Sequence, residues 1–319
     1  MDSNKTIRIG TRDSELALWQ AYTVQKKLND LGYKTQIIAV KSHGDILLDK
    51  PLYELGITGI FTKTLDIAMI SGKVDIAVHS MKDVPTVLPV GIVQAAVLER
   101  ASTLDILVHK GNLDFLEGTG TIATGSLRRQ AQWLHKYPNH KVVDLRGNVN
   151  TRMQKLNESD WNGAVFAAAG LERIGLTPSP SPKERGASPA LDFINLDWMI
   201  PAPAQGAMVI VAMQNDDFCK EAVAKLNHNA TEICTQIERE FLKTLEGGCT
   251  APIGALAKIN NNEIQFVGNL FSIDGKEKIA MESTISLDNW TDFGKDCAGE
   301  ILEKGGVTLM KTIKESLKK

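Results

Sequence analysis

Apolar positions at the start of the chain predict a strand, a helix and a second strand. Residues 7–10 form a short apolar segment typical of a strand. The helix is predicted from apolar residues at helical spacing, namely Leu18, Tyr22, Leu28 and Leu31. Asp13 or Ser14 is its predicted N-cap, because either side chain can accept a hydrogen bond from a free backbone N–H group. Residues 36–40 predict the next strand, so the chain opens with a β-α-β unit.

The same order of strand, turn and helix recurs along the first two thirds of the chain. Further strands are predicted at 74–78, 122–124, 142–144 and 164–169, and a helix is predicted at 61–70. Two stretches lack periodicity: 42–59, which we predict to be a mobile loop, and 177–197, which we predict to be an irregular insertion. Strands that alternate with helices predict parallel sheets, whose ligands bind beyond the carboxyl ends of the strands.

The pattern changes after residue 227. The last part of the chain predicts helices at 231–245 and 296–317 and strands at 254–259 and 264–270. Residues 200–211 form an apolar segment that we expect to return to the first domain. The sequence therefore predicts an α/β protein with a discontinuous first domain (1–104 and 200–222), a second α/β domain (105–199) and a smaller α+β C-terminal domain (223–319).

Composition restricts the possible partners. The chain has 319 residues, of which 43% are hydrophobic and 23% are charged, so it is long enough for more than one core. Its formal net charge of -2 gives no overall field that would attract nucleic acid or an anionic membrane. A polar N-terminus and the lack of a long apolar run predict a cytoplasmic protein that crosses no membrane. We also expect a monomer, because no heptad pattern is sustained.

Cysteine and histidine spacing gives no metal or disulfide signal. The cysteines are Cys219, Cys234, Cys249 and Cys297, with no C-x-x-C spacing and no paired histidines nearby. Cys249 follows two glycines and has no basic neighbour that would favour its thiolate, and most isolated cysteines are small core residues. We expect His43 and His79 to be satisfied turn or core histidines.

Arginine is concentrated in short turns that contain Gly or Ser and follow apolar segments. These arginines are Arg12, Arg128, Arg129, Arg146, Arg152 and Arg173, whereas lysine is spread over helical segments and both ends of the chain. A guanidinium group is planar, always charged and able to bind a carboxylate through two hydrogen bonds. The turns therefore predict one cleft for a small acidic substrate with several arms. Adjacent cations at a helix N-terminus repel each other, so an anion best explains Arg128 and Arg129.

Lys82 and Asp83 follow the predicted strand at 74–78. One interpretation is a helix cap or an ion pair between neighbours in a turn. The other is a carboxylate held among cations, which would stay ionised and would either stabilise positive charge on a substrate nitrogen or transfer protons. The residues alone leave both interpretations open.

Five ordered motifs resemble those of one enzyme family. They are Thr11-Arg12-Asp13-Ser14-Glu15-Leu16-Ala17, His79-Ser80-Met81-Lys82-Asp83-Val84-Pro85, Gly125-Ser126-Leu127-Arg128-Arg129-Gln130, Leu145-Arg146-Gly147-Asn148-Val149 and Leu245-Glu246-Gly247-Gly248-Cys249. Together they resemble hydroxymethylbilane synthase, also called porphobilinogen deaminase, along nearly the whole chain. The chain departs from the family's common pattern at Thr58, where a lysine is common, and at Pro203-Ala204, where Val-Gly is more usual.

The resemblance implies a fold of two periplasmic-binding-protein-like α/β domains around a cleft, plus a third domain. It also implies an enzyme of tetrapyrrole (heme) biosynthesis that joins four porphobilinogen molecules head to tail, with loss of four ammonia. The released hydroxymethylbilane would pass to uroporphyrinogen-III synthase. The implied cofactor is dipyrromethane, held by Cys249 through a thioether and used as the primer.

The resemblance further implies a role for each matched residue. Asp83 would be catalytic, with a carboxylate that contacts pyrrole N–H groups and stabilises the azafulvene-like cation formed when ammonia leaves. The implied cofactor-binding residues are Cys249, Lys82, Asp83, Ser126, Arg128, Arg129 and Arg146. The implied substrate-binding residues are Arg12, Ser14, Arg152 and Arg173.

Two other classes of protein are weaker interpretations of the same residues. A two-lobed protein that binds small anions without catalysis would also place arginines at strand ends. The third domain, Cys249 after two glycines and the lack of a recognisable signal peptide argue against it. A nucleotide-dependent transferase would require G-x-G-x-x-G after a strand or G-x-x-x-x-G-K-[ST], and the sequence contains neither.

Overall fold

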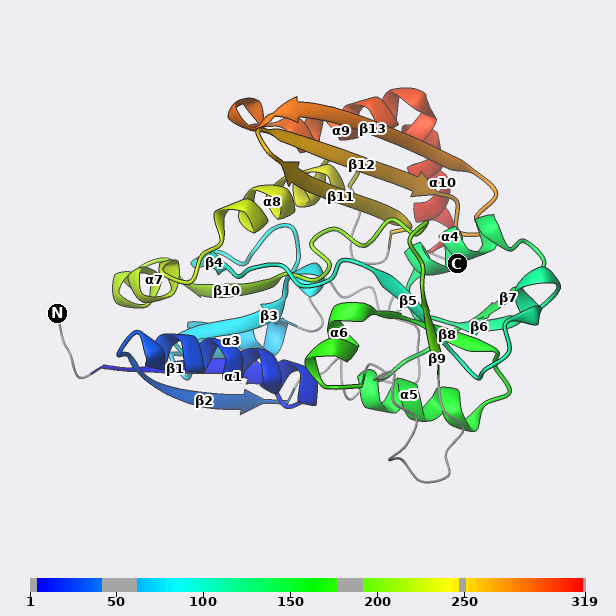
Figure 1. Ribbon diagram of the computed structural model, residues 1–319. Coiled ribbons are helices and arrows are strands. Elements are labelled where there is room, and N and C mark those ends of the chain that lie inside the picture. The colour runs from blue at the N-terminus through cyan, green and yellow to red at the C-terminus, as the bar shows by residue number, and fades with distance from the viewer. Residues whose placement is uncertain (1–4, 42–61, 177–191, 247–250, 318–319) are drawn as a thin grey trace.

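Three β-sheets, each covered by helices, make up the molecule (Figure 1). The structure is a computed structural model that describes residues 5–41, 62–176, 192–246 and 251–317. In Figure 1 the first sheet lies at the left, the second at the right and the third above them. The fold class expected from the sequence is confirmed, whereas the boundaries of the three domains stay predictions.

Lobe 1 is built on a mixed sheet with the strand order β2-β1-β3-β10-β4. Its strands are β1 (Thr6–Arg12), β2 (Lys34–Val40), β3 (Ile76–Ser80), β4 (Ile92–Val97) and β10 (Met208–Met213). Its helices are α1 (Glu15–Asp30), α3 (Lys63–Ile70), the short 3-10 helix η2 (Met81–Asp83) and α7 (Asp217–Ala224). Because β10 lies between β3 and β4, the chain returns to lobe 1 after building lobe 2, as the sequence predicts.

Helix α1 packs on its sheet through Leu28, one of the residues that predict the helix, and through the smaller Ala21 and Val24. Ala21, Val24 and Leu28 are fully buried against the core that includes Ile7 and Ile9 of β1. Tyr22 and Leu31 are instead exposed, by 56% and 47%. The expected helix is therefore confirmed, and two of the apolar residues that predict it lie on its exposed side.

Lobe 2 is built on a second mixed sheet with the order β7-β6-β8-β5-β9. Its strands are β5 (Asp105–His109), β6 (Thr121–Ala123), β7 (Lys141–Val143), β8 (Gly163–Ala167) and β9 (Asp192–Asn195). Its helices are η3 (Asp114–Glu117), α4 (Leu127–Lys136), α5 (Val149–Glu158) and α6 (Ala168–Arg173). Strand β9 pairs with β5, so the end of the segment 177–197 is a strand and not the irregular structure expected there.

Parallel pairing holds for only part of each sheet. The expected parallel order is found where a helix connects the strands, among β1, β2 and β3 and among β6, β7 and β8. Strands β5 and β10 instead enter their sheets from the other lobe, along residues 98–104 and 196–207, and run antiparallel to their neighbours. The expectation of parallel sheets is therefore wrong for the strands that follow the two crossings between the lobes, which we call the hinge segments.

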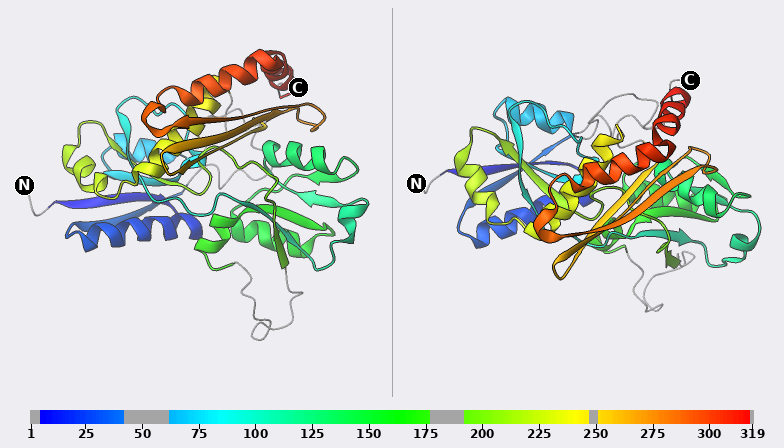
Figure 2. Two further views of the ribbon diagram at one scale, coloured as in Figure 1. Left: turned by 45° about the horizontal axis from the view of Figure 1, so that its top comes forward. Right: turned by 90° about the horizontal axis from the view of Figure 1, so that it is seen from above.

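The C-terminal domain packs helices on one face of a three-stranded antiparallel sheet (Figure 2). Its elements are α8 (Asn229–Thr244), β11 (Ile253–Asn260), β12 (Glu263–Phe271), β13 (Lys278–Ser286), η4 (Leu287–Asn289), α9 (Phe293–Ile301) and α10 (Val307–Ser316). Phe241 and Phe266 centre the core, with ring centroids 5.1 Å apart. The expected final helix over 296–317 is wrong as one element, because Gly305, with φ of 105°, breaks it between α9 and α10.

The contacts between the C-terminal domain and the two lobes include one at a hairpin and one at the hinge segments. The hairpin between β12 and β13 lies on α4 of lobe 2, where the His135 Nδ1 donates to the Gly275 carbonyl at 2.8 Å. Gly275 has φ of +74°, and a Cβ there would lie 2.4 Å from the Ala131 carbonyl, so only glycine fits. At the hinge segments, the fully buried Glu238 of α8 binds Arg100 through two hydrogen bonds of 2.7 and 2.9 Å.

Ala204, in the second hinge segment, adopts φ of 61°, a region that favours glycine. It is fully buried, and its N–H donates to Glu238 Oε2 at 2.6 Å, which holds this conformation in place. The family resemblance places a glycine at this position more usually, which agrees with the backbone that the structure requires.

No helix in the described part of the chain is both long and apolar enough to cross a membrane.

We expect Ala204→Gly to leave the free energy of unfolding nearly unchanged. Relief of left-handed strain, about 1–2 kcal/mol, offsets the lost burial of a methyl group, about 0.8 kcal/mol, and the greater freedom of unfolded glycine. The matched control is Ala207→Gly, which removes an equally buried methyl from a residue with no left-handed strain and should cost about 1–2 kcal/mol. Urea unfolding would measure both, and equal losses in the two variants would contradict the prediction.

Candidate active site

A pocket lies at the carboxyl ends of β1 and β3 in lobe 1. Its lining includes Arg12, Ser14, Gln20, His79, Ser80 and Asp83. These strands are parallel neighbours, so the residues that follow them face the same edge of the sheet. Ser14 precedes the first turn of α1, and Gln20 on the same helix donates to Ser80 Oγ at 2.8 Å. The structure thus brings together Arg12, Ser14 and Asp83, three of the residues expected to bind or transform the substrate.

His79 is a buried polar residue in the wall of this pocket. Only 6% of it is exposed, and its Nε2 has no hydrogen-bond partner in the part of the chain that the structure describes. Burial, with a smaller contribution from the charge of Arg12, lowers the pKa of His79 to about 4, so the ring is neutral at physiological pH. The expectation of a core histidine is confirmed, but that of a satisfied one is wrong.

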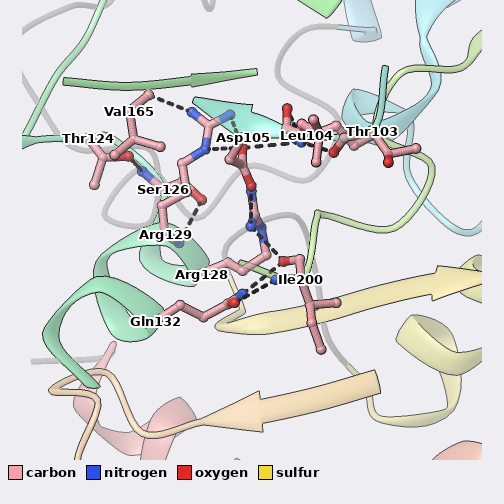
Figure 3. Close-up of polar contacts among 12 residues, drawn as sticks. Thr103, Leu104, Asp105, Thr124, Ser126, Arg128, Arg129, Gln132, Val165 and Ile200 are labelled. Atoms are coloured by element: carbon pink, nitrogen blue, oxygen red, sulfur yellow. Dashed lines mark hydrogen bonds and ion pairs between the residues drawn. The ribbon is translucent and has the colours of Figure 1, made fainter. Parts of the chain in front are cut away.

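Arg128 and Arg129 bind a carboxylate of the chain itself, Asp105 at the start of β5 (Figure 3). Arg128 Nη1 lies 2.7 Å from Asp105 Oδ2 and also donates to the Ile200 carbonyl at 2.8 Å. Arg129 Nε donates to Asp105 Oδ1 at 2.8 Å, and its Nη1 donates to the Val165 carbonyl at 2.9 Å. The anion that the sequence predicts beside these arginines is therefore present as a protein side chain.

This cluster of Asp105, Arg128 and Arg129 is almost closed to solvent. Asp105 is fully buried, and the two arginines are 3% and 5% exposed. Burial alone would raise the pKa of Asp105, but the two guanidinium groups outweigh it and lower that pKa to about 2. The cluster therefore keeps one negative and two positive charges, and its net charge is positive. Arg128 Nε is buried without a hydrogen-bond partner among the described residues.

Lys82 and Gln205 connect this cluster to lobe 1. Gln205 Nε2, from the second hinge segment, donates to Asp105 Oδ1 at 3.1 Å, and Lys82 Nζ donates to Gln205 Oε1 at 3.3 Å. Burial, followed by the nearby charge of Arg129, lowers the pKa of Lys82 to about 8, while Asp83 acts in the opposite direction. The two lobes thus meet where several cationic side chains surround two carboxylates, those of Asp83 and Asp105.

Arg146 and Arg152 extend the cationic wall of lobe 2. Arg146 is 4% exposed, and Gly147, with φ of +117°, turns the chain immediately after it. Arg152 Nε donates to the Gly147 carbonyl at 2.8 Å. Burial, then the charge of Arg129, lowers the pKa of Arg152 to about 10, while Asp83 of lobe 1 raises it. The charge of Asp83 in lobe 1 thus acts on Arg152 in lobe 2.

Ser126 and Arg173 have local structural contacts besides the roles expected for them. Ser126 is the N-cap of α4, where its side chain accepts a long hydrogen bond, 3.5 Å, from the Arg129 N–H. Arg173 Nη2 donates to the Gly206 carbonyl at 2.6 Å, and its guanidinium carbon lies 5.6 Å from the centroid of the Trp19 ring. Arg173 thus connects α6 to a hinge segment and to α1, and it does not line the lobe 1 pocket described above.

Several expected residues lie outside the described part of the chain. They are Cys249, His43 and Thr58. The other three cysteines, Cys219, Cys234 and Cys297, are buried with free thiols. Burial raises the pKa of Cys219 and of Cys297 to about 12 and that of Cys234 to about 11, so all three are unreactive core residues.

Four polar residues important to the site went unnoticed in the sequence. They are Asp105, Arg100, Glu238 and Arg239. Asp105 begins a buried apolar strand, and an acidic residue in front of such a segment is also an ordinary strand boundary. Arg100 and Glu238 are 138 positions apart, so no local pattern connects them. For Asp105 alone there was a signal, since two adjacent buried arginines require a counter-ion.

Comparison with known proteins gives matches along nearly the whole chain. A family model described as "Porphobilinogen deaminase, dipyromethane cofactor binding domain" matches residues 7–221, and one described as "Porphobilinogen deaminase, C-terminal domain" matches residues 232–303. The chain is 37% identical over 312 residues to porphobilinogen deaminase of Pelobacter propionicus, which covers 97% of both chains. It is 40% identical over 311 residues to the chloroplastic porphobilinogen deaminase of Oryza sativa subsp. japonica, covering 94% of this chain and 84% of that one.

Solved structures with a partial likeness are more distant. The periplasmic VFT2 domain of BvgS from Bordetella pertussis is 13% identical with a TM-score of 0.41, covering 69% of this chain and 86% of that chain. A periplasmic substrate-binding protein of an ABC transporter from Coxiella burnetii is 16% identical with a TM-score of 0.41, covering 70% of this chain and 93% of that chain.

Asp105→Asn should destabilise the protein by about 3–5 kcal/mol, because it leaves two buried guanidinium groups without a counter-charge. The lowered pKa of Asp105, about 2, means that its contribution is complete above the unfolded value near 4 and is lost as pH falls toward 2. The variant should therefore be less stable at neutral pH and lose less stability between pH 4 and pH 2. Urea unfolding at several pH values measures both effects. The exposed Asp160→Asn is the control, and equal stability of the two variants would contradict the prediction.

Proposed function

Because the chain belongs to the porphobilinogen deaminase family, it is a transferase that carries a dipyrromethane cofactor and acts on porphobilinogen, and we propose which of its residues do so. Its activity is that of hydroxymethylbilane synthase, which joins four porphobilinogen molecules head to tail with loss of four ammonia. The observation that carries our assignment of residues is the meeting of several cations with the carboxylate of Asp83 where the two lobes face each other.

The residues at this place fit a cofactor and a substrate that both carry carboxylate arms. Lys82, Arg128, Arg129 and Arg146, together with the N-cap Ser126, form the proposed cofactor-binding set. The buried Nε of Arg128 lacks a partner among the described residues and is a donor that an additional carboxylate would satisfy. When bound, dipyrromethane supplies the primer to which the substrate units are added.

Arginine and serine side chains on both lobes are the proposed clamps for the acetate and propionate arms of porphobilinogen. Arg12 and Ser14 line the pocket of lobe 1. Arg152 lies in lobe 2, and the negative charge of Asp83 raises its pKa. A guanidinium group holds a carboxylate through two hydrogen bonds, which orients the ring as well as binding it. Arg173 stays in this set as a proposal, although part of its guanidinium group binds the Gly206 carbonyl.

Asp83 is the proposed catalytic residue. It lines the pocket with Arg12, and its charge raises the pKa of Lys82 and of Arg152, against the larger lowering by burial. A fixed carboxylate at this place would accept hydrogen bonds from pyrrole N–H groups. It would also stabilise the positive charge that develops on the substrate as ammonia departs, and this stabilisation acts most strongly in a site that excludes water.

Asp105 makes the cationic wall possible without neutralising it. It takes up one of the two positive charges of Arg128 and Arg129 and fixes the direction of both side chains before any substrate arrives. The remaining positive charge attracts carboxylates, and little reorganisation is needed when they bind. Preorganisation of this kind lowers the cost of holding an acidic ligand.

Other parts of the proposal concern the anchor and the cellular setting. Cys249 is the proposed thioether anchor of the cofactor, and the buried state of Cys219, Cys234 and Cys297 leaves these three poorly suited to that role. We further propose a monomeric cytoplasmic enzyme whose product is taken up by uroporphyrinogen-III synthase.

Intact mass spectrometry tests the assignment of the anchor. The purified protein should exceed its sequence mass by two pyrrole units, and the addition should lie on the peptide that contains Cys249. Cys249→Ser should lack the addition, whereas the control Cys234→Ser, at a buried thiol, should retain it. An unmodified protein that still consumes porphobilinogen would refute the proposal.

Replacing Asp83 by Asn tests the catalytic charge. We expect kcat to fall by about 10²–10³, as when one stabilising group is removed from a preorganised site, with KM changed much less. The measurement is porphobilinogen consumption by protein whose mass shows the cofactor in place. Glu99→Gln, at an exposed acid in the first hinge segment, is the control. Consumption near the wild-type rate in cofactor-loaded Asp83→Asn would exclude an essential charge.

A further inference from the structure

Arg239 of the C-terminal domain holds the backbone of the turn that carries Lys82 and Asp83. Its Nη1 donates to the Val84 carbonyl at 2.9 Å and to the Met81 carbonyl at 3.4 Å. Its Nη2 donates to the Pro85 carbonyl at 2.6 Å. One guanidinium group thus binds carbonyls on both sides of Lys82 and Asp83. The bonds cross 154 to 158 positions of sequence and join two structural units.

The turn needs such support because regular structure ends at this point. β3 passes into η2, which ends at Asp83, and regular helix or strand does not resume until β4 begins at Ile92. Pro85 has no N–H group, so it cannot be held by donating a backbone hydrogen bond. On the strand side, the Met81 N–H donates to the Ala207 carbonyl at 3.0 Å.

Holding these carbonyls fixes the orientation of Asp83. A peptide unit is planar, so a fixed Met81 carbonyl sets the plane that leads into Lys82, and fixed carbonyls at Val84 and Pro85 set the planes that follow Asp83. The side chains of Met81 and Val84 are buried in the lobe 1 core and anchor the turn independently of Arg239. Loss of Arg239 would therefore leave the turn folded, but the orientation of the Asp83 carboxylate would be less well fixed.

We propose that Arg239 is a positioning residue for the reaction, which keeps the carboxylate of Asp83 in its catalytic orientation by binding the carbonyls of Met81, Val84 and Pro85. This inference rests on the proposed role of Asp83. It also gives the C-terminal domain a part in catalysis, because α8 carries Arg239 directly after Glu238, the residue bound to Arg100 at the hinge segments.

The test is steady-state kinetics of Arg239→Ala and Arg239→Lys in cofactor-loaded protein. For Arg239→Ala we expect kcat to fall about 10- to 100-fold, the loss expected when a catalytic group is misplaced by about 1 Å, while KM changes less than about twofold. Arg239→Lys should recover part of the rate, because one ammonium group replaces only some of the three bonds. Lys243→Ala, which removes an exposed cation from the same helix, is the control and should behave as wild type.

A chemical rescue separates positioning from a merely structural role. Free guanidinium ion at low millimolar concentration should raise kcat of Arg239→Ala several-fold and should leave wild type and Lys243→Ala unchanged. The proposal is overturned if cofactor-loaded Arg239→Ala keeps a kcat within twofold of wild type. It is also overturned if the loss of rate is matched by a loss of thermal stability and guanidinium restores neither.

The same experiment distinguishes failure of this inference from failure of the proposed function. Wild type without a cofactor addition, or Asp83→Asn with full activity, would remove the premise. A loaded wild type and an impaired Asp83→Asn, combined with a fully active Arg239→Ala, would refute only the role of Arg239.

Discussion

A buried carboxylate between two arginines is the interaction on which the site depends. Asp105 stands at the start of β5, where the chain has just crossed from lobe 1, and it binds Arg128 and Arg129 at the first turn of α4. A buried ion pair adds little net stability, because desolvation of the charges offsets their attraction. Its value here is geometric: without Asp105 two cations would not stay side by side at a helix N-terminus. The placement of Arg128 and Arg129 in the cationic wall of lobe 2 follows from this one residue.

The hinge segments connect that wall to the turn of lobe 1 that carries Lys82 and Asp83. Gln205 binds Asp105 and Lys82, so a residue of the returning segment joins the two lobes by its side chain. The neighbouring Ala204 and Gly206 have positive φ, and the Gly206 carbonyl accepts a hydrogen bond from Arg173. A short stretch of unusual backbone is thus in contact with residues from both lobes and, through Glu238, from the C-terminal domain. The backbone conformation at Ala204, Gln205 and Gly206 therefore helps to set how the two lobes are placed relative to each other.

Much of this arrangement could be predicted from the sequence, because the motifs are local. A short apolar segment followed by Arg12 or Asp83 predicts a strand end, and parallel strand ends meet at one edge, so the pocket in lobe 1 follows. The antiparallel entry of β5 and β10 could not be predicted, since direction depends on which lobe the chain comes from. Strand β13 was missed because few of its residues are buried. Asp105, Glu238 and Arg239 were missed because their partners lie far away in the sequence.

The C-terminal domain contacts the rest of the molecule near the hinge segments and at α4 of lobe 2. Near the crossing of the lobes, Glu238 is enclosed and accepts hydrogen bonds from Arg100, Ala204 and Ala257. At the end of the β12–β13 hairpin, contact with α4 includes the hydrogen bond between His135 and Gly275. In Figure 1 the hairpin reaches out over lobe 2, so a given rotation of one lobe moves its tip further than it moves α8. The C-terminal domain thus meets the molecule both where the chain crosses between the lobes and on a helix of lobe 2.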